Sequence, residues 1–338
     1  MLSGPAVNSA IISRTDSVCR RSAVTNRLFA AVLLLALSVV TTTTAKAENS
    51  ICGGTRIPID TSVLSEPFAN LALGGNKGNF LIDTGATQSQ VDRHRYGVPE
   101  GSKISLSGLP LPLVQGGMFV AADLRSFAAP RGEELGVVGT DLLSLLSIEF
   151  HYEQPQPFAA LGRKACDRTT LRRAGFIAVG LPGYYEANLS GLKRGMPNVP
   201  VISLRIGQVT FPAQVDTGYG DNNPRGVVQV NAALMRTLRA TGVVAHSAPG
   251  PVVTVDCSGT YNYERWQIEY EELSIVTPGG NVIASYPPPL LEVKTDARCG
   301  GISAFAEAFA QIGASWLSRW GKSVFDGLNS AVWIPKGR

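Results

Sequence analysis

The sequence of 338 residues predicts an all-β fold of two related halves with a few short helices. The first observation behind this prediction is that the tripeptide Asp83-Thr84-Gly85 returns 133 residues later as Asp216-Thr217-Gly218. The second is that each copy ends the same hairpin pattern. The third is the composition, because 36 glycines and 21 prolines suit short strands and turns better than long helices.

The hairpin before each tripeptide aligns with its counterpart without a gap. Residues 68–85 lie over residues 201–218, so that Gly74 matches Gly207. In both copies apolar residues alternate up to a glycine-containing turn, and a second apolar strand then leads into the aspartate. A lone Asp-Thr-Gly is most often an ordinary turn. Its repetition in the same setting indicates a duplicated unit whose two aspartates serve one site.

A second pair of segments extends the duplication. Residues 135–150 predict a buried strand, a glycine at Gly139, a short helix and another strand. Residues 310–335 repeat this order with Gly313 in the place of Gly139. The clearest helical pattern elsewhere covers residues 231–240, whose apolar side chains fall on one face.

As a set, these residues resemble the bilobal pepsin-like aspartic proteases. In that family two related β-rich lobes each contribute one Asp-Thr-Gly loop to a central cleft. The steps that end at Gly139 and Gly313 resemble the segments that cross behind the two catalytic loops. The resemblance covers most of the chain after an N-terminal leader. It implies two β-barrel-like lobes, which we place at residues 48–172 and 173–338.

The resemblance assigns the reaction to Asp83 and Asp216. Two carboxyl groups held close together cannot both ionise easily, so they share a proton and titrate as a coupled pair. One carboxyl is then the acid and the other the base. A water between them would attack a peptide carbonyl without a metal, a cofactor or a covalent intermediate.

Four neighbouring residues would support the two catalytic loops. Gly85 and Gly218 allow a tight loop and a close approach of the backbone, which a Cβ atom would hinder. In the family, the threonines that match Thr84 and Thr217 hydrogen-bond across the lobe interface. They thereby hold the two loops in register.

The residue after each tripeptide departs from the family pattern. Pepsin-like enzymes usually have a Ser or Thr there, whereas this chain has Ala86 and Tyr219. Fewer hydroxyl donors to the ionised carboxylates raise the pKa values of the pair, so we expect an activity optimum less acidic than that of pepsin. Tyr219 either lines the cleft as a substrate-binding residue or blocks it, and Asp221 adds negative charge nearby.

In the family, a hairpin of the first lobe closes over the substrate as a flap. Here the first aspartate and the glycine behind it are 56 residues apart, against 97 in the second half. The first lobe therefore resembles a retropepsin subunit in size. Residues 114–119 are the flap candidate, in which Gly116 and Gly117 would give mobility and Met118 would cover the substrate. An ordinary hairpin turn is the alternative interpretation.

Residues 1–47 are typical of a secretory signal peptide. Four arginines precede the apolar run from Leu28 to Val40, and residues 45–47 match a small-residue cleavage site. We predict cleavage after Ala47. An uncleaved membrane anchor is the alternative, although this apolar run is short for a spanning helix. The first aspartate lies 36 residues after Ala47, which leaves no room for a long inhibitory pro-segment.

The leader also accounts for the basic character of the chain. The whole chain has a formal net charge of +4, and the leader carries five basic residues and one acidic residue. The remaining chain is therefore formally neutral. It lacks the basic clusters that phosphate binding requires, so we expect no nucleic-acid partner and no membrane association after signal removal.

Four cysteines remain after the leader: Cys52, Cys166, Cys257 and Cys299. An even number is typical of disulfides in an exported chain, and the close Cys and His spacing of a metal site is missing from the sequence. Four cysteines allow three pairings. We favour Cys52 with Cys166 and Cys257 with Cys299, because each pair stays within one proposed lobe. The second pair also resembles a loop disulfide of the family's second lobe.

The resemblance thus implies an exported, monomeric aspartic endopeptidase, located in a periplasm or outside the cell. Its substrate would be a peptide or protein in an extended conformation, with apolar side chains beside the cleaved bond. The alternative is a catalytically inactive binding or inhibitor protein on the same fold, which Tyr219 and the reduced flap favour. A third, unrelated class is an exported β-protein in which the motifs occur by chance.

Overall fold

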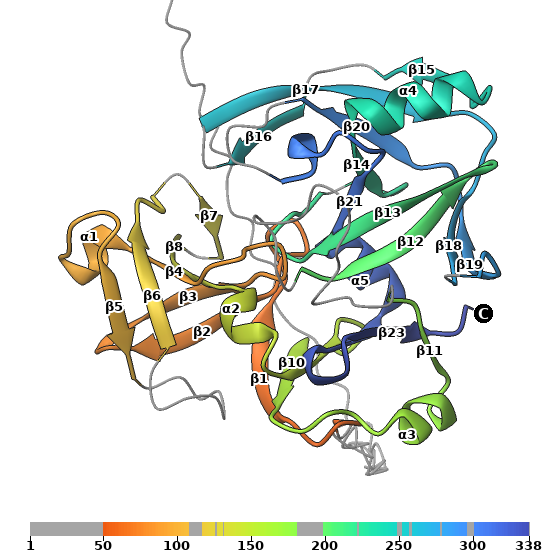
Figure 1. Cartoon of the computed structure of the whole chain (residues 1–338). Helices are drawn as coiled ribbons and strands as arrows, with labels where there is room; N and C mark the ends of the chain where they lie inside the picture. Colours follow the sequence, from red (N-terminus) through yellow and green to blue (C-terminus); the bar gives the residue numbers. More distant parts are fainter. Residues whose placement is uncertain are drawn as a thin grey trace, which may run out of the picture. The chain divides into compact units, whose positions relative to one another are not determined.

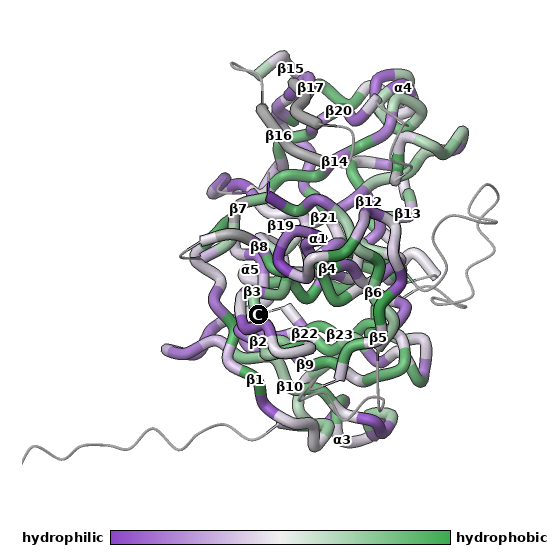
Figure 2. Tube along the Cα trace, turned by 90° about the vertical axis from the view of Figure 1, so that its left-hand side faces the viewer, coloured by the Kyte–Doolittle hydropathy of each residue, from purple (hydrophilic) through white to green (hydrophobic). Residues whose placement is uncertain are grey.

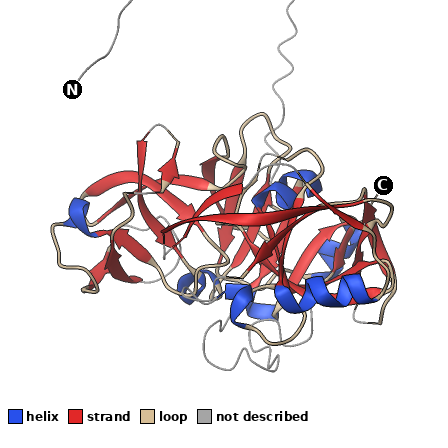
Figure 3. Ribbon diagram, turned by 90° about the horizontal axis from the view of Figure 1, so that it is seen from above, coloured by secondary structure: helices blue, strands red, loops and turns tan. Residues whose placement is uncertain are grey.

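The computed structural model describes residues 50–107, 117–125, 127–130, 132–180, 199–221, 223–248, 252–256, 259–277, 279–295 and 301–337. All of them belong to one compact unit that extends from Glu48 to Arg338. Most of this part of the chain is β-strand, and its helices are short (Figure 3). The predicted all-β fold class is confirmed.

The first half of the described chain runs from orange to light green in Figure 1. Its elements are β1 (Thr55–Asp60), β2 (Phe68–Leu73), β3 (Asn76–Ile82), β4 (Gln90–Asp92), α1 (Arg93–Tyr96), β5 (Lys103–Leu106), β6 (Gly117–Ala122), β7 (Ala128–Ala129), β8 (Gly132–Val138), α2 (Thr140–Leu143), β9 (Ser147–His151), β10 (Phe158–Gly162), α3 (Arg168–Arg173) and β11 (Phe176–Ala178).

The second half runs from green to blue in the same view (Figure 1). Its elements are β12 (Val201–Ile206), β13 (Val209–Asp216), β14 (Val227–Asn231), α4 (Ala232–Ala240), β15 (Ala245–Ser247), β16 (Val252–Asp256), β17 (Gly259–Ile268), β18 (Leu273–Val276), β19 (Val282–Tyr286), β20 (Leu290–Lys294), η1 (Gly301–Ala304), β21 (Ala310–Gly313), α5 (Ala314–Trp320), β22 (Lys322–Asp326), η2 (Gly327–Asn329) and β23 (Ala331–Pro335).

The two predicted hairpins are present, as β2–β3 in the first half and β12–β13 in the second. Gly74 and Gly207 lie in their turns with φ angles of 54° and 56°. This left-handed conformation strains any residue with a Cβ, so it explains why the turns of both copies carry glycine at the same place. The duplication seen in the sequence is therefore a duplication of structure.

The strands next to these hairpins repeat as well. In the first half the sheet order is β2-β3-β8-β4-β6-β5, and in the second half it is β12-β13-β21-β14-β20-β17. The last strand before each aspartate has a parallel neighbour, β8 beside β3 and β21 beside β13. Because parallel strands end at the same edge of a sheet, Gly139 and Gly313 arrive directly beside the two Asp-Thr-Gly loops.

The predicted helix at residues 231–240 is confirmed as α4. Asn231 is its N-cap and accepts a hydrogen bond from the backbone N–H of Leu234 at 2.9 Å. Leu234, Met235 and Leu238 form its buried face. The helix thus covers the core of the second half with the side chains that the sequence placed on one face.

The two halves share one sheet. Its strand order includes β11-β23-β22-β9-β10-β1, in which β22 and β23 come from the end of the chain and the others from its first half. Phe150 of β9 and Phe325 of β22 pack edge to face, with ring centroids 5.6 Å apart. Figure 2 shows hydrophobic residues along these strands. The boundary that we predict between residues 172 and 173 falls inside α3.

A disulfide joins Cys52, just before β1, to Cys166, just before α3. This confirms the first of the two predicted pairings. Cys257 and Cys299 lie outside the described residues, so their pairing stays a prediction.

Candidate active site

The two Asp-Thr-Gly loops leave parallel strand pairs in the same way. Asp83 follows β3, and Asp216 is the last residue of β13. Behind the first loop, the N–H of Thr140 donates to the carbonyl of Ala86 at 2.7 Å. Behind the second, the N–H of Ala314 donates to the carbonyl of Tyr219 at the same distance. These equivalent bonds confirm that the segments ending at Gly139 and Gly313 lie behind the loops.

Gly85 and Gly218 show that the two loops face each other at close range. A Cβ atom on Gly85 would overlap the carboxyl group of Asp216, and one on Gly218 would overlap the carboxyl group of Asp83. Only glycine leaves the required space at either position. The close approach that the sequence predicted is therefore reciprocal, and it brings Asp83 and Asp216 together.

Thr84 and Thr217 bind each loop to the backbone of the other half. The Thr84 hydroxyl donates to the carbonyl of Val215 at 2.7 Å, and the Thr217 hydroxyl donates to the carbonyl of Ile82 at 2.5 Å. The N–H of Thr84 donates to Thr217 Oγ1 at 2.9 Å, and the N–H of Thr217 donates to Thr84 Oγ1 at 3.1 Å. Both threonines are buried. Four symmetric bonds thus hold the loops in register.

Backbone N–H groups support the Asp83 carboxylate more than the Asp216 carboxylate. Asp83 Oδ1 accepts from the N–H of Gly85 at 2.7 Å and from that of Ala86 at 3.1 Å. Asp216 Oδ1 accepts from the N–H of Gly218 at 2.9 Å. In the second loop, the N–H that follows the glycine, that of Tyr219, donates instead to the backbone carbonyl of Asp216 at 3.2 Å. The ionised form is therefore better stabilised on Asp83.

The two carboxyl groups are also linked to each other. A hydrogen bond joins the side chains of Asp83 and Asp216. Burial raises the pKa of both groups, and the charge of Asp83 raises the pKa of Asp216 further. Both residues keep some exposed surface. The pair is therefore partly exposed, and the ionisation of each carboxyl affects that of the other.

Tyr219, a predicted substrate-binding residue, makes its polar contact with the second half, and its place in a substrate-binding surface stays a prediction. Its hydroxyl donates to Glu292 Oε2 at 2.8 Å, and Arg265 binds the other oxygen of Glu292 at 2.9 Å. Gly313 lies directly against the Tyr219 ring and backbone. The phenol hydroxyl is therefore bound within the second half, by Glu292 of β20.

Asp221 is likewise engaged away from the pair. The hydroxyl of Ser315 on α5 donates to its carboxylate, and the N–H of Asn223 donates to the other oxygen at 2.8 Å. Asp221 thus holds the segment after the second catalytic loop to α5.

Only residues 117–119 of the flap candidate belong to the described part of the chain, and they lie in β6, away from the aspartates. Gly117 and Met118 begin β6, and Gly117 pairs with Leu106 of β5. Leu106 contacts Gly74 in the β2–β3 turn, so this end of the β5–β6 pair lies at the start of β3, whereas Asp83 follows its end. The seven residues of β3 span roughly 20 Å. Gly116 lies outside the described residues, and Gly117 and Met118 are not brought to the aspartates.

The structure adds two residues that the sequence did not single out, Glu66 and Glu134. Glu66 lies between β1 and β2, and Glu134 lies on β8. Burial raises the pKa of Glu66 to about 8, with a further contribution from the charge of Asp83. Burial likewise raises the pKa of Glu134, and the charges of Asp83 and Glu66 add to the shift. Both carboxyls therefore lie close enough to Asp83 to interact with its charge.

A comparison of the two repeats contains the signal that would have found these residues. The same alignment places Val199 opposite Glu66, and the alignment of Gly139 with Gly313 places Ala308 opposite Glu134. Apolar residues thus stand in the second half where acidic residues stand in the first. A fully or partly buried acid is uncommon in a protein, so the difference between the repeats singles out these two positions.

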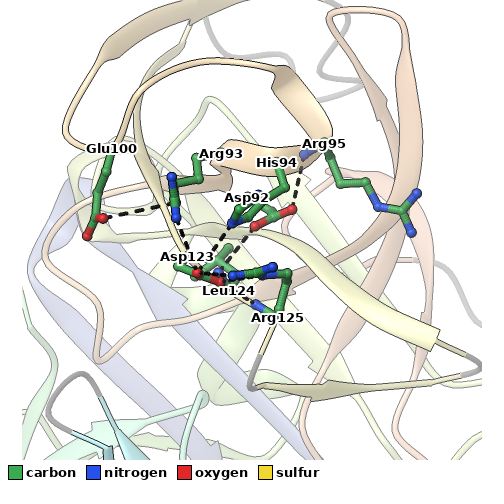
Figure 4. Close-up of polar contacts among 8 residues, drawn as sticks. All are labelled: Asp92, Arg93, His94, Arg95, Glu100, Asp123, Leu124 and Arg125. Atoms are coloured by element: carbon green, nitrogen blue, oxygen red, sulfur yellow. Dashed lines mark hydrogen bonds and ion pairs between the residues drawn. The ribbon is translucent and has the colours of Figure 1, made fainter.

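One group of possible metal ligands occurs among the described residues, formed by Asp92, His94 and Asp123 (Figure 4). Asp92 accepts from the N–H groups of Arg95 and Leu124, as an N-cap of α1 does. Asp123 is bound by Arg125 at 2.6 Å and by His94 at 3.3 Å. These contacts already satisfy both carboxylates. The group therefore fixes α1 to the segment after β6.

None of the helices in the described ranges has the length and apolar character needed to cross a membrane.

The strand order and the two facing loops define the class: a two-lobed protein with the pepsin-like fold. No protein-family model matches the chain, and no curated protein matches it. Among solved structures, basic 7S globulin from soybean is 15% identical, with a TM-score of 0.43, over 83% of this chain and 94% of that one. Conglutin gamma, a basic 7S globulin from lupine seeds, is 10% identical, with a TM-score of 0.46, over 83% and 95%. Neither similarity carries information about function.

Proposed function

We propose that this chain is an aspartic-type endopeptidase that hydrolyses peptide bonds with a water activated by Asp83 and Asp216. One observation carries the proposal: the two Asp-Thr-Gly loops contact each other reciprocally, so that Gly85 and Gly218 have no room for a side chain. This contact holds two hydrogen-bonded carboxyl groups at a partly exposed position. A structural turn would need neither the paired glycines nor the shared proton.

The hydrogen bonds assign different roles to the two aspartates. Because backbone N–H groups favour the ionised form of Asp83, this residue acts as the general base and takes a proton from the attacking water. Asp216 holds the shared proton and donates a hydrogen bond to the oxygen of the attacked carbonyl as negative charge develops there. The threonine contacts keep both groups in position during the reaction.

The wider setting is proposed with the activity. The substrate is a peptide or protein in an extended conformation, and the enzyme acts as a monomer. The protein is exported after removal of residues 1–47, to a periplasm or to the outside of the cell. The Cys52–Cys166 disulfide is consistent with an oxidising compartment.

The proposal is tested by incubating the chain from Glu48 with a denatured protein from about pH 3 to 8. We expect cleavage, with an optimum less acidic than that of pepsin, because the pKa values of both aspartates are raised. Asp83→Asn and Asp216→Asn should each lower kcat/KM by about 10²–10⁴-fold. Glu100→Gln serves as the control, because this exposed side chain lies outside the site.

A folded wild-type sample that cleaves nothing at any pH would contradict the proposal. The second candidate function would then apply, a catalytically inactive protein that binds or inhibits other proteins. One observation favours it: Gly117 and Met118, which belong to the flap candidate, are not brought to the aspartates.

A further inference from the structure

Two hydrogen bonds hold Tyr219 from outside its own loop. Its backbone carbonyl accepts from the N–H of Ala314 at 2.7 Å, and its hydroxyl donates to Glu292 Oε2 at 2.8 Å. The first of these bonds recurs in the other loop, where the carbonyl of Ala86 accepts from the N–H of Thr140. The second bond has no equivalent there, because the side chain of alanine has no polar atom.

Glu292 is a firmly held acceptor for this hydroxyl. It lies on β20, with β14 on one side and β17 on the other, and its side chain is 1% exposed. Arg265, its partner in register on β17, binds Oε1 at 2.9 Å. Gln229, its partner on β14, donates to Oε2 at 3.5 Å. A buried carboxylate persists where donors and an opposite charge surround it, so Glu292 is fixed in the sheet.

The first half has no such acceptor at the matching place. Gln229 and Gln90 are equivalent, because each stands two residues before the N-cap of a helix. On the neighbouring parallel strand, Gln229 pairs with Glu292, whereas Gln90 pairs with Val120. A tyrosine and a glutamate in the second half thus stand where the first half has an alanine and a valine.

The two loops also differ in the direction of the N–H that follows the glycine. In the first loop the N–H of Ala86 donates to Asp83 Oδ1 at 3.1 Å. In the second loop the N–H of Tyr219 donates to the backbone carbonyl of Asp216 at 3.2 Å. The carbonyls of Ala86 and Tyr219 are held in the same way, so the difference in direction accompanies the difference in side chain.

We propose that Tyr219 and Glu292 are positioning residues for Asp216: the hydrogen bond between them, the Tyr219–Glu292 anchor, holds the N–H of Tyr219 away from the Asp216 carboxyl. This inference rests on the proposed function, in which Asp216 is the acid, and deepens it. With one backbone donor where Asp83 has two, Asp216 is the less favourable place for negative charge and keeps the proton of the pair. Arg265 acts only by holding Glu292.

The charges near these groups are the same with and without the anchor. Burial raises the pKa of Asp216 most, the charge of Asp83 raises it further, and that of Lys294 lowers it. Burial also raises the pKa of Tyr219 well above its ordinary value, so its hydroxyl stays protonated. The charged groups that act on Tyr219 are Glu292, Asp221 and Arg265. Removing the neutral hydroxyl therefore changes the hydrogen bonds of the loop and none of these charges.

The test compares kcat/KM of the wild type and Tyr219→Phe over the pH range used above. Without the anchor, the N–H at position 219 is able to turn to the Asp216 carboxyl and stabilise its ionised form. We expect the alkaline limb of the pH profile, which reports loss of the proton from the pair, to move to lower pH by about one unit. Tyr270→Phe is the control, because this tyrosine of the same half is 73% exposed.

An alkaline limb at the same pH in the wild type and in Tyr219→Phe would overturn the anchor and leave the proposed function intact. A rate that falls by the same factor at every pH has the same meaning, because the loss of a merely structural contact produces it.

Nuclear magnetic resonance of the wild type tests the anchor without any hydrolysis. A backbone N–H that donates to a carboxylate changes its chemical shift when that carboxyl titrates. The amide signals of Ala86 and Gly218 should therefore follow the titration of the pair, whereas that of Tyr219 should change far less. A Tyr219 amide that follows the titration as closely as that of Ala86 would overturn the anchor. Since this measurement uses the wild type, it depends neither on cleavage nor on the folding of a variant.

Discussion

Gly85 and Gly218 set the separation of the catalytic carboxyls. Each faces the aspartate of the other loop, and the space between them admits hydrogen but no methyl group. The threonine bonds prevent the loops from moving apart to make room, because they join the same loops from behind. A single methyl group at this place must therefore displace a catalytic residue.

We accordingly expect Gly85→Ala to lower kcat/KM by about 100-fold, since small misplacements of reacting groups have effects of this size. The free energy of unfolding should fall as well, because the added Cβ overlaps the Asp216 carboxyl. Cleavage rates and denaturant unfolding of the same sample check both effects. Gly279→Ala is the control, because the nearest atom to its added Cβ is 3.7 Å away. Unchanged activity in Gly85→Ala would show that the loops do not meet as described.

Glu66 makes the free energy of unfolding depend on pH, and its raised pKa gives the sign of this dependence. Its pKa rises from 4.5 to about 8 on folding, so the folded state binds more protons than the unfolded state between these values. The free energy of unfolding must then decrease as pH rises through this window, by at most about 1.4 kcal/mol per pH unit from one group. The groups that face Glu66 are Asp83, Glu134, Tyr152 and the N–H of Gly220.

We therefore expect Glu66→Gln to reduce the loss of stability between pH 5 and pH 8. Urea unfolding of the wild type and the variant at four pH values in this range measures the two slopes. Part of the slope should remain, because Glu134 titrates in the same direction. Identical slopes in both proteins would mean that Glu66 ionises freely in the folded state.

At the scale of the elements, each half has a Ser–Asp hydrogen bond between its catalytic loop and the short helix behind that loop. The serine and the aspartate have exchanged places between the two halves. In the first half Ser89 donates to Asp141 of the short helix behind the loop, at 2.7 Å. In the second half Ser315 of the helix donates to Asp221 after the loop. Both bonds fasten the catalytic loop to the helix that follows the glycine step. The sequence suggested that Asp221 adds charge near the catalytic pair, whereas the structure shows it as the acceptor of the Ser315 hydrogen bond.

Elements that occur in two copies were predictable from the sequence. The hairpins ending at Asp83 and Asp216, and the strands leading to Gly139 and Gly313, each had a counterpart that supported the same interpretation. The helix α4 was predictable because the spacing of Leu234, Met235 and Leu238 places these apolar side chains on one face. Repetition and periodicity thus sufficed for the elements that position the two aspartates.

Elements without a counterpart were not predictable in this way. The spacing of Gly117 and Met118 from Asp83 suits a flap, but spacing does not reveal at which end of β3 the β5–β6 pair lies. Glu66 and Glu134 show no pattern of their own in the sequence, and the effect of the Asp83 charge on their pKa values arises only in the folded protein. The direction of the Tyr219 phenol depends on Glu292, which lies 73 residues away.

At the scale of the whole molecule, the disulfide closes a long loop. Cys52 and Cys166 are 114 residues apart, and the loop between them contains most of the first half. Linking such distant residues restricts the unfolded chain, which stabilises the folded state by about 2–5 kcal/mol. The bond also joins the segment before β1 to the segment before α3, at the base of the shared sheet.

We expect the variant Cys52→Ala/Cys166→Ala to lose about 2–5 kcal/mol of unfolding free energy. Guanidinium unfolding of the variant and the wild type, both without reductant, measures the difference and leaves Cys257 and Cys299 untouched. A loss below about 0.5 kcal/mol, the range of ordinary surface substitutions, would show that the disulfide does not restrict the unfolded chain.

The sheet that the two halves share imposes an order on biosynthesis. β9 pairs with β10 of its own half on one side and with β22, 171 or more residues later in the chain, on the other. While the chain is still being made, β9 therefore has one unpaired edge, although all its residues are buried in the folded protein, and such an edge is a template for wrong pairing. A chaperone that shields this edge until residue 326 has emerged would protect the nascent protein. Chains that stop before Lys322 should therefore accumulate as aggregates rather than as a folded first half.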